Sequence, residues 1–213
     1  MPRADDRSRG WTHGLLVASR HPLTATRFTP FHAQQWWQRA LVRQGVLSTS
    51  VRVADQQMCI AVVHTTAGGR RGPEAASVEQ LRHRQLAELD ACVRQQPYPT
   101  LVCGDLNCGP EASPENFRAL LDWDFVDAAP LGGPTWDPQN ALNRAGPYSD
   151  SPAQRVDHVL LDRRAAAKSR VSRARLVHTE PVVPTAAGRV TLSDHYGVLV
   201  DLVSESEIHA ATS

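Results

Sequence analysis

Side chains of the kinds used in hydrolysis stand at the ends of several apolar runs that we predict to be strands. They are His64, which closes CIAVVH; Asp105 and Asn107, in the GDLN that follows LVC; Asp157, which opens the strand VDHVLL; and Asp194 and His195, in the SDH that precedes YGVLVDLV. Carboxylates and imidazoles exchange protons near neutral pH, and a carboxamide can hold a water molecule or a phosphate oxygen. Such a set could align and activate water beside a phosphate group.

The GDLN segment places a carboxylate and a carboxamide two residues apart. At the end of a strand, Asp105 and Asn107 can point the same way, and Gly104 permits a sharp turn beside them. Asp105 could take a proton from water that Asn107 helps to hold. The simpler interpretation is a turn, because Asp and Asn favour turns wherever they occur.

The histidines need partners from elsewhere in the chain. Asp194 and His195 are adjacent, so their side chains point apart on a strand and Asp194 is not expected to orient His195. Asp157 is the expected partner, because a carboxylate behind an imidazole fixes its tautomer and raises its basicity. His64 is a further candidate, although a single histidine at a strand end is often structural.

The elements that must position these residues are mostly strands. Expected strands cover residues 14–19, 23–31, 46–53, 58–64, 100–103, 156–161, 171–177 and 198–203, and expected helices run from Ser77 to Val93 and from Ser113 to about Leu121. Ser77 and Gln80 fit a capping box. Residues 131–152 are rich in Gly, Pro, Asn and Ser and predict a long functional loop. The irregular alternation predicts a layered α/β fold with mixed or antiparallel sheets.

Composition restricts the class of protein. The chain has 213 residues, 41% hydrophobic and 21% charged, which are values of a globular protein. Its 23 basic and 22 acidic residues give a net charge of +1 and no general attraction to nucleic acid or anionic lipid. No apolar run is long enough to span a membrane. Four cysteines without a CxxC pair predict reduced thiols and a cytoplasmic chain, or a secreted one if an upstream segment precedes it.

In the order strand-end His64, GDLN, RVDHVLL and SDH, these segments resemble the endonuclease/exonuclease/phosphatase superfamily of metal-dependent phosphodiesterases. The resemblance extends from GLLVASRHPL to SDHYGVLVDL, about residues 14–203. It implies a four-layered α/β sandwich, two mixed sheets flanked by helices, between a disordered or linker N-terminus (1–13) and a frayed tail (204–213). TWDP at 135–138 with Asn140, and SPA at 151–153, resemble the neutral sphingomyelinase branch.

The resemblance also implies a role for each residue. Asp105 would orient or deprotonate the attacking water, Asn107 would hold the scissile phosphate, and Asp194 would lie near the metal. His195, oriented by Asp157, would stabilise the transition state or protonate the leaving group, and His64 would be a second histidine facing the phosphate. Oxygen ligands without a Cys/His cluster favour Mg²⁺ over Zn²⁺.

The sequence departs from the family pattern at several points. The superfamily begins with a strand carrying Asn and a strand ending in Gln-Glu, whose Glu binds the metal; neither precedes Gly14. Val62 stands where the family has Asn, and residues 180–192 lack the aromatic side chains of a membrane-entering hairpin. We therefore expect a fold that is incomplete at its N-terminus, and a chain that by itself is poorly soluble, binds Mg²⁺ weakly and shows no Mg²⁺-dependent phosphodiesterase activity.

Three functions remain open. TWDP and the low net charge favour a Mg²⁺-dependent hydrolase of sphingomyelin or another phosphodiester lipid. A nuclease would use the same residues and a basic groove, which Arg163, Arg164, Lys168, Arg170, Arg173 and Arg175 could supply, although a solvated face explains them as well. The third is an inactive fragment, or a gene model with a misplaced start.

Trp36 and Trp37 are expected to pack in a core or interface, with lipid or base contact as the alternative. The oligomeric state is not predicted.

Overall fold

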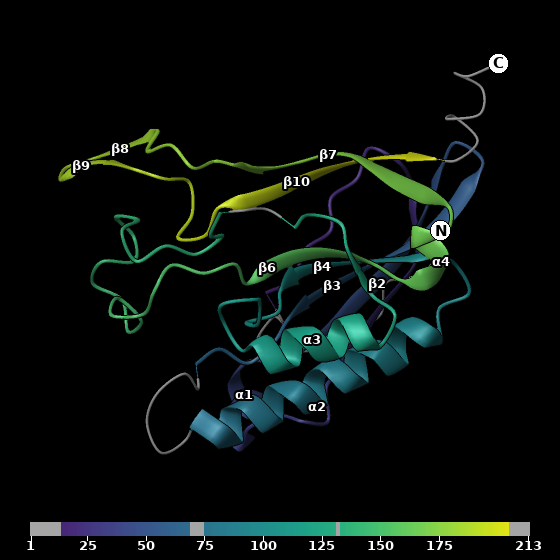
Figure 1. Cartoon of the computed structure of the whole chain (residues 1–213), viewed down its shortest axis with the longest axis horizontal. Coiled ribbons are helices and arrows are strands. Elements are labelled where there is room, and N and C mark those ends of the chain that lie inside the picture. Colours follow the sequence, from purple (N-terminus) through teal and green to yellow (C-terminus); the bar gives the residue numbers. More distant parts are fainter. Residues whose placement is uncertain (1–13, 69–74, 131–132, 205–213) are drawn as a thin grey trace.

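The computed structural model describes residues 14–68, 75–130 and 133–204 (Figure 1). Helices, a large sheet and a small sheet form successive layers of this part of the chain. The linker expected at 1–13 and the tail expected beyond Ser204 lie outside the described residues, whereas Ser204 itself ends a strand.

The large sheet has six strands in the order β1-β2-β3-β4-β6-β5. They are β1 (Leu23–Pro30), β2 (Gly45–Val53), β3 (Gln56–His64), β4 (Thr100–Asp105), β5 (Val126–Asp127) and β6 (Asp157–Leu161). Only β3 and β4 are parallel, and a helix connects them. The predicted hairpin is confirmed as β2–β3, and its two-residue turn contains no glycine because Ala54 takes the left-handed conformation (φ 49°).

Of the four helices in the described part of the chain, α2 (Ala75–Arg94) and α3 (Pro114–Asp122) cover one face of this sheet. The other two are α1 (Trp36–Leu41) and α4 (Arg163–Ala166). On α2, Leu86 and Leu89 are fully buried and belong to one core with Val102 and Leu160 of the sheet. The helical spacing therefore predicted the buried face of α2 correctly. The capping box predicted at Ser77 and Gln80 is wrong, because α2 is already helical at Ala75 and Ser77 therefore lies inside the helix.

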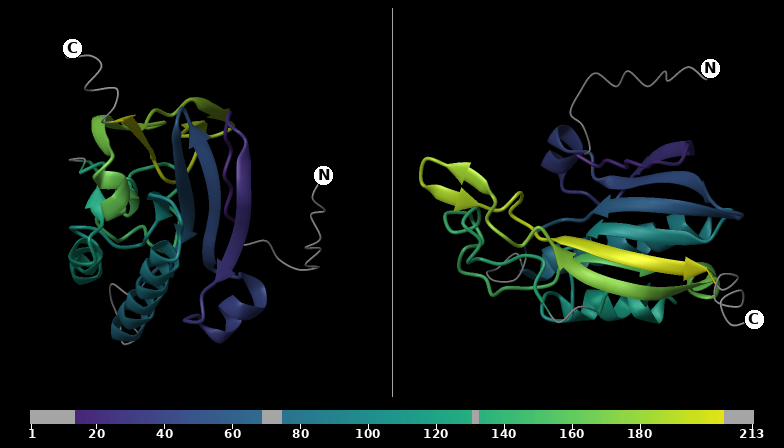
Figure 2. Two further views of the ribbon diagram at one scale, coloured as in Figure 1. Left: turned by 90° about the vertical axis from the view of Figure 1, so that its right-hand side faces the viewer. Right: turned by 90° about the horizontal axis from the view of Figure 1, so that it is seen from above.

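A two-stranded antiparallel sheet packs on the opposite face. It consists of β7 (Ser169–Val177) and β10 (Gly197–Ser204), and the hairpin of β8 (Val183–Thr185) and β9 (Gly188–Val190) projects beyond it (Figures 1 and 2). Val171 and Val200 of the small sheet pack with Leu101 and Val159 of the large one. Helices over a large sheet that in turn packs on a second sheet confirm the predicted α/β sandwich.

Two expectations about apolar residues are wrong. Residues 14–19 form no strand, and Leu16 is 81% exposed. Their apolar character suggested a buried strand, but the run joins no ladder of the described sheets. Trp36 is 82% exposed and not part of a core, because α1 turns Gln38 inward instead. Its packing in an interface stays a prediction, and the side chain of Trp37 lies outside the described part of the chain. Among the described helices, none combines the length and hydropathy needed to cross a membrane.

Candidate active site

The ends of β3, β4 and β6 bring three of the predicted residues into one row. His64 is the register partner of Asp105, and Asp105 is the register partner of Asp157. Partners in a ladder project to the same side of a sheet, so the row collects an imidazole and two carboxylates. Gly104 allows β3 and β4 to approach here: its φ is 138°, and a Cβ at this position would lie 2.0 Å from the carbonyl oxygen of Val63.

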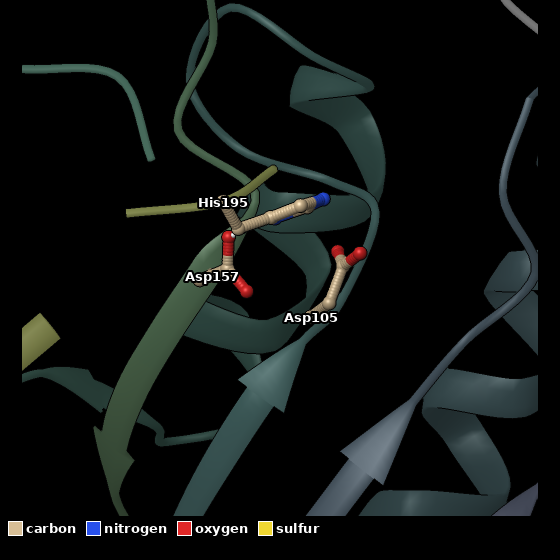
Figure 3. Close-up of side chains that lie close together, drawn as sticks. All are labelled: Asp105, Asp157 and His195. Atoms are coloured by element: carbon tan, nitrogen blue, oxygen red, sulfur yellow. Dashed lines mark hydrogen bonds and ion pairs between the residues drawn. The ribbon is translucent and has the colours of Figure 1, made fainter. Parts of the chain in front are cut away.

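Asp157 and His195 form the closest pair of the site (Figure 3). The Nδ1 atom of His195 lies 2.8 Å from Oδ2 of Asp157, and the two residues are 38 positions apart. The backbone N–H of Asp157 donates to Oγ1 of Thr135 at 3.0 Å, and Trp136 forms a β-bridge to His195. The TWDP segment thus connects both members of the pair.

Asp105 lies opposite this pair. Ligand atoms of Asp105, Asp157 and His195 all lie within 4.8 Å of one another. Burial, followed by the negative charge of Asp157, raises the pKa of the Asp105 carboxyl from 3.8 to about 6. Its Oδ2 lies 3.5 Å from Nε2 of the half-exposed His64, and its Oδ1 accepts a hydrogen bond from the backbone N–H of Asn107 at 2.8 Å.

His195 carries the opposite charge at neutral pH. Burial lowers the pKa of its imidazole, but the hydrogen bond and charge of Asp157 outweigh burial. With the further charges of Asp105 and Asp194, the pKa of His195 rises from 6.5 to about 9. The site therefore pairs a carboxylate that ionises near neutral pH with an imidazole that stays protonated.

Asn107 is held in a strained turn beside the row. It is 7% exposed, has a left-handed backbone (φ 48°), and donates from Nδ2 to the carbonyl oxygen of Thr65 at 3.1 Å. Non-glycine residues in this conformation are uncommon and often found at functional sites. The fixed carboxamide keeps a second N–H for another acceptor.

Asp194 lines the same cavity but lies outside the cluster of three ligand residues. Its side chain is exposed and accepts a hydrogen bond from Oγ of Ser193 at 3.1 Å. Its backbone carbonyl is held by Nδ2 of Asn143 at 2.8 Å and by Nδ2 of Asn140 at 3.3 Å. The structure thus fixes the backbone of the SDH segment and leaves the carboxylate of Asp194 free to face the cavity.

Sequence reasoning missed Thr135 and Asn143 as residues that position the site. Both lie in the long loop, where Asn140 was noted only for its likeness to one branch of the family. The available signal was two asparagines three residues apart in a Gly- and Pro-rich loop, since buried carboxamides pair with backbone groups. His158, the neighbour of Asp157, is buried instead: its Nε2 lies 2.8 Å from the carbonyl oxygen of Cys108, and burial lowers its pKa.

A cavity of about 470 Å³ opens over the row. It is lined by His64, Ala67, Gly68, Asp105, Asn107, Trp136, Pro147, Tyr148, Asp150, Ser151, Gln154, Val156, Asp194 and His195. All predicted site residues except Asp157 appear in this lining, and Asp157 contacts it through His195. None of the six basic residues considered for a nuclease groove lines it; Arg170, Arg173 and Arg175 are exposed on β7.

The model of the endonuclease/exonuclease/phosphatase family matches residues 3–195. The chain belongs to this family. The four segments singled out in the sequence therefore belong to a family of enzymes that hydrolyse phosphate esters, and the observed row of carboxylates and histidines is where they meet. Among curated proteins, no relative matches the sequence.

Solved structures of the family share the fold. A variant of beta toxin from Staphylococcus aureus with bound magnesium ions is 21% identical, with a TM-score of 0.66 over 86% of this chain and 62% of the toxin. Sphingomyelinase C from Streptomyces griseocarneus is 21% identical (TM-score 0.62, 85% and 65%). TDP2 from D. rerio, solved with a single-strand DNA product, is 17% identical (TM-score 0.62, 85% and 68%). The chain thus spans about two thirds of the length of these proteins.

Proposed function

We propose that this chain is a Mg²⁺-dependent phosphodiesterase acting on a phospholipid of the sphingomyelin type. The observation that carries the proposal is the cavity in which the Asp157–His195 pair faces Asp105, with their ligand atoms within 4.8 Å of one another. Hydrolysis of a phosphodiester needs an aligned water molecule and groups that stabilise charge on the phosphorus oxygens and leaving group. This cavity holds side chains for each task.

Asp105 and His195 supply the proton transfers. With a pKa of about 6, Asp105 is largely ionised at neutral pH and accepts a proton from the attacking water. With a pKa of about 9, His195 is protonated and donates to the leaving oxygen, while Asp157 holds its Nδ1. The second N–H of the Asn107 carboxamide binds a phosphate oxygen, and His64 at the rim faces the same group.

The donor set fits a hard divalent cation. Asp105 and Asp157 offer carboxylate oxygens within one cluster, and Asp194 faces the same cavity. Mg²⁺ is commonly held by one or two carboxylates together with water molecules and substrate oxygens, so a full protein cage is not required. We assign Asp105 and Asp157 as its anionic partners, with Asp194 contacting it through water. When bound, Mg²⁺ polarises a phosphoryl oxygen and balances the charge of the carboxylates.

The charge of the cavity favours a lipid over a nucleic acid. Its lining contains Asp105, Asp150 and Asp194 but neither lysine nor arginine among the described residues. A nuclease binds a polyanion and gains most of its affinity from cations that contact successive phosphates. A phospholipid presents one phosphodiester, for which the protonated His195 and Mg²⁺ suffice.

The test measures phosphocholine release from sphingomyelin in mixed micelles with Mg²⁺, beside nicking of double-stranded DNA. We expect phosphocholine release to exceed DNA cleavage and to be abolished by EDTA. Asp105→Asn and His195→Gln should each lower this release by about 100-fold or more. Asp122→Asn, at an exposed carboxylate on α3, is the control for loss of one negative charge. Nicking of DNA without phosphocholine release would identify the chain as a nuclease, and no activity on either substrate would contradict the proposal.

A further inference from the structure

One side of the cavity comes from the long loop rather than from strand ends. Tyr148 and Asp150 line it there, and we call these two residues the loop wall. Asn143, within the same loop, donates from Nδ2 to the carbonyl oxygens of Asp137 and Asp194, both at 2.8 Å. The loop wall is therefore fixed to the SDH segment at its base.

Tyr148 extends from this anchored base across the cavity. It is 44% exposed, and a Cβ built on Gly68 would lie 3.3 Å from its hydroxyl oxygen. Gly68 belongs to the segment that follows His64, on the other side of the cavity. The hydroxyl of Tyr148 thus lies against the segment that follows His64, and Trp136, beside His195, adds a second aromatic side chain to the lining.

The loop wall offers negative charge without a partner. Asp150 is exposed and makes no hydrogen bond or ion pair with any described residue, and it lies outside the three-residue cluster that could hold a metal. Its carboxylate is therefore free to meet a positive charge that enters the cavity.

We infer that the loop wall is a subsite for the positively charged amine group of a zwitterionic phosphodiester. The inference rests on the proposed phosphodiesterase function. A carboxylate and two aromatic side chains together suit a cation, and aromatic faces are a frequent means of binding quaternary ammonium groups. In a headgroup such as phosphocholine or phosphoethanolamine, two carbons separate the amine from the phosphate, so both ends can occupy one cavity of about 470 Å³.

The arrangement also provides selectivity against anionic substrates. A phosphodiester with a neutral or acidic headgroup would leave Asp150 unpaired in the cavity, and an acidic one would be repelled by it. The strand ends thus recognise the phosphate, and the loop wall distinguishes headgroups by charge.

The experiment compares chromogenic substrates that differ only in this group. They are p-nitrophenylphosphocholine, p-nitrophenylphosphoethanolamine and the neutral isostere p-nitrophenyl 3,3-dimethylbutyl phosphate. We expect kcat/KM of the wild type for at least one cationic substrate to exceed that for the isostere by about tenfold or more. The ratio of the choline and ethanolamine values shows whether a quaternary or a primary amine is preferred.

The variants test the wall itself. In Asp150→Asn the preference for the cationic substrate should fall at least about fivefold, and Tyr148→Leu should reduce it further. Asp122→Asn, which changes net charge equally outside the cavity, should keep the preference. A wild type without preference, or an Asp150→Asn variant that retains it, would overturn the inference.

Binding separates this inference from the proposed function. If the wild type turns over neither these substrates nor sphingomyelin, the proposed function fails, and calorimetry with phosphocholine and with 3,3-dimethylbutyl phosphate decides the subsite. Tighter binding of phosphocholine, lost in Asp150→Asn, would support the loop wall even without catalysis. Equal affinity for the two compounds would overturn it.

Discussion

Replacing Asp105 by asparagine should stabilise the fold while it abolishes hydrolysis. Burial, followed by the charge of Asp157, raises the pKa of the Asp105 carboxyl from 3.8 to about 6. The folded chain then binds this proton more tightly than the unfolded chain. The stability contributed by the protonated form is therefore fully present below the unfolded pKa and is lost as the pH rises through the folded pKa. Above that pH, folding has to keep a buried carboxylate charged.

The size of the effect follows from the shift. A difference of about two pKa units corresponds to about 3 kcal/mol, at 1.36 kcal/mol per unit. Asparagine has nearly the same shape and can still accept the hydrogen bond from the backbone N–H of Asn107. We therefore expect the free energy of unfolding to rise by about 2–3 kcal/mol at pH 7.5, equivalent to roughly 4–12 °C in Tm for a chain of this size.

The assay is urea and thermal unfolding of the wild type and Asp105→Asn in EDTA, at pH 7.5, 6 and 4.5. The gain should shrink steadily toward pH 4.5, where the wild-type carboxyl is protonated in the folded state. Asp122→Asn should change stability by no more than about 0.5 kcal/mol at any pH, because its carboxylate is exposed. An Asp105→Asn variant no more stable than the wild type at pH 7.5, or equally stabilised at pH 4.5, would refute the argument from burial.

Three further predictions concern the same row of residues. The pH dependence of kcat/KM should be bell-shaped, with the acid limb set by Asp105 and the alkaline limb by His195, and Asp157→Asn should move the alkaline limb to lower pH because Asp157 raises the pKa of His195; an unmoved limb would contradict this. His195→Ala should lower kcat by about 100-fold or more with an unchanged circular dichroism spectrum. Gly104→Ala should lower the free energy of unfolding by about 2 kcal/mol or more, since its Cβ would clash with the carbonyl of Val63, and an unchanged urea midpoint would disprove the clash.

The sequence predicted those parts of the site that depend on local geometry. Adjacent side chains on a strand point to opposite sides, which is why Asp157 rather than Asp194 was expected beside His195, and the structure places Asp157 there. The helical spacing of α2 likewise indicated its buried face from period alone. Both inferences need only the geometry of one element and no knowledge of its neighbours.

Features that depend on distant pairing were not predictable in the same way. An apolar run such as 14–19 becomes a strand only where its backbone pairs with another strand, and that pairing is not encoded in the run itself. The anchoring of the SDH backbone by Asn143, and the approach of Tyr148 to Gly68, join segments separated by dozens of residues through a loop without periodicity. Composition marked that loop as functional, but its contacts follow from tertiary structure.

The row formed by His64, Asp105 and Asp157 has a consequence for how such a protein can diverge. A one-residue insertion or deletion within β3, β4 or β6 would shift the register and turn the affected side chain to the other face of the sheet, so lineages that keep the chemistry must keep these strand lengths. The loop between Asn143 and Gln154 belongs to no ladder except at its end and can change length or sequence without disturbing the row. Headgroup preference can therefore evolve, or be engineered by loop exchange, while the hydrolytic residues stay in place.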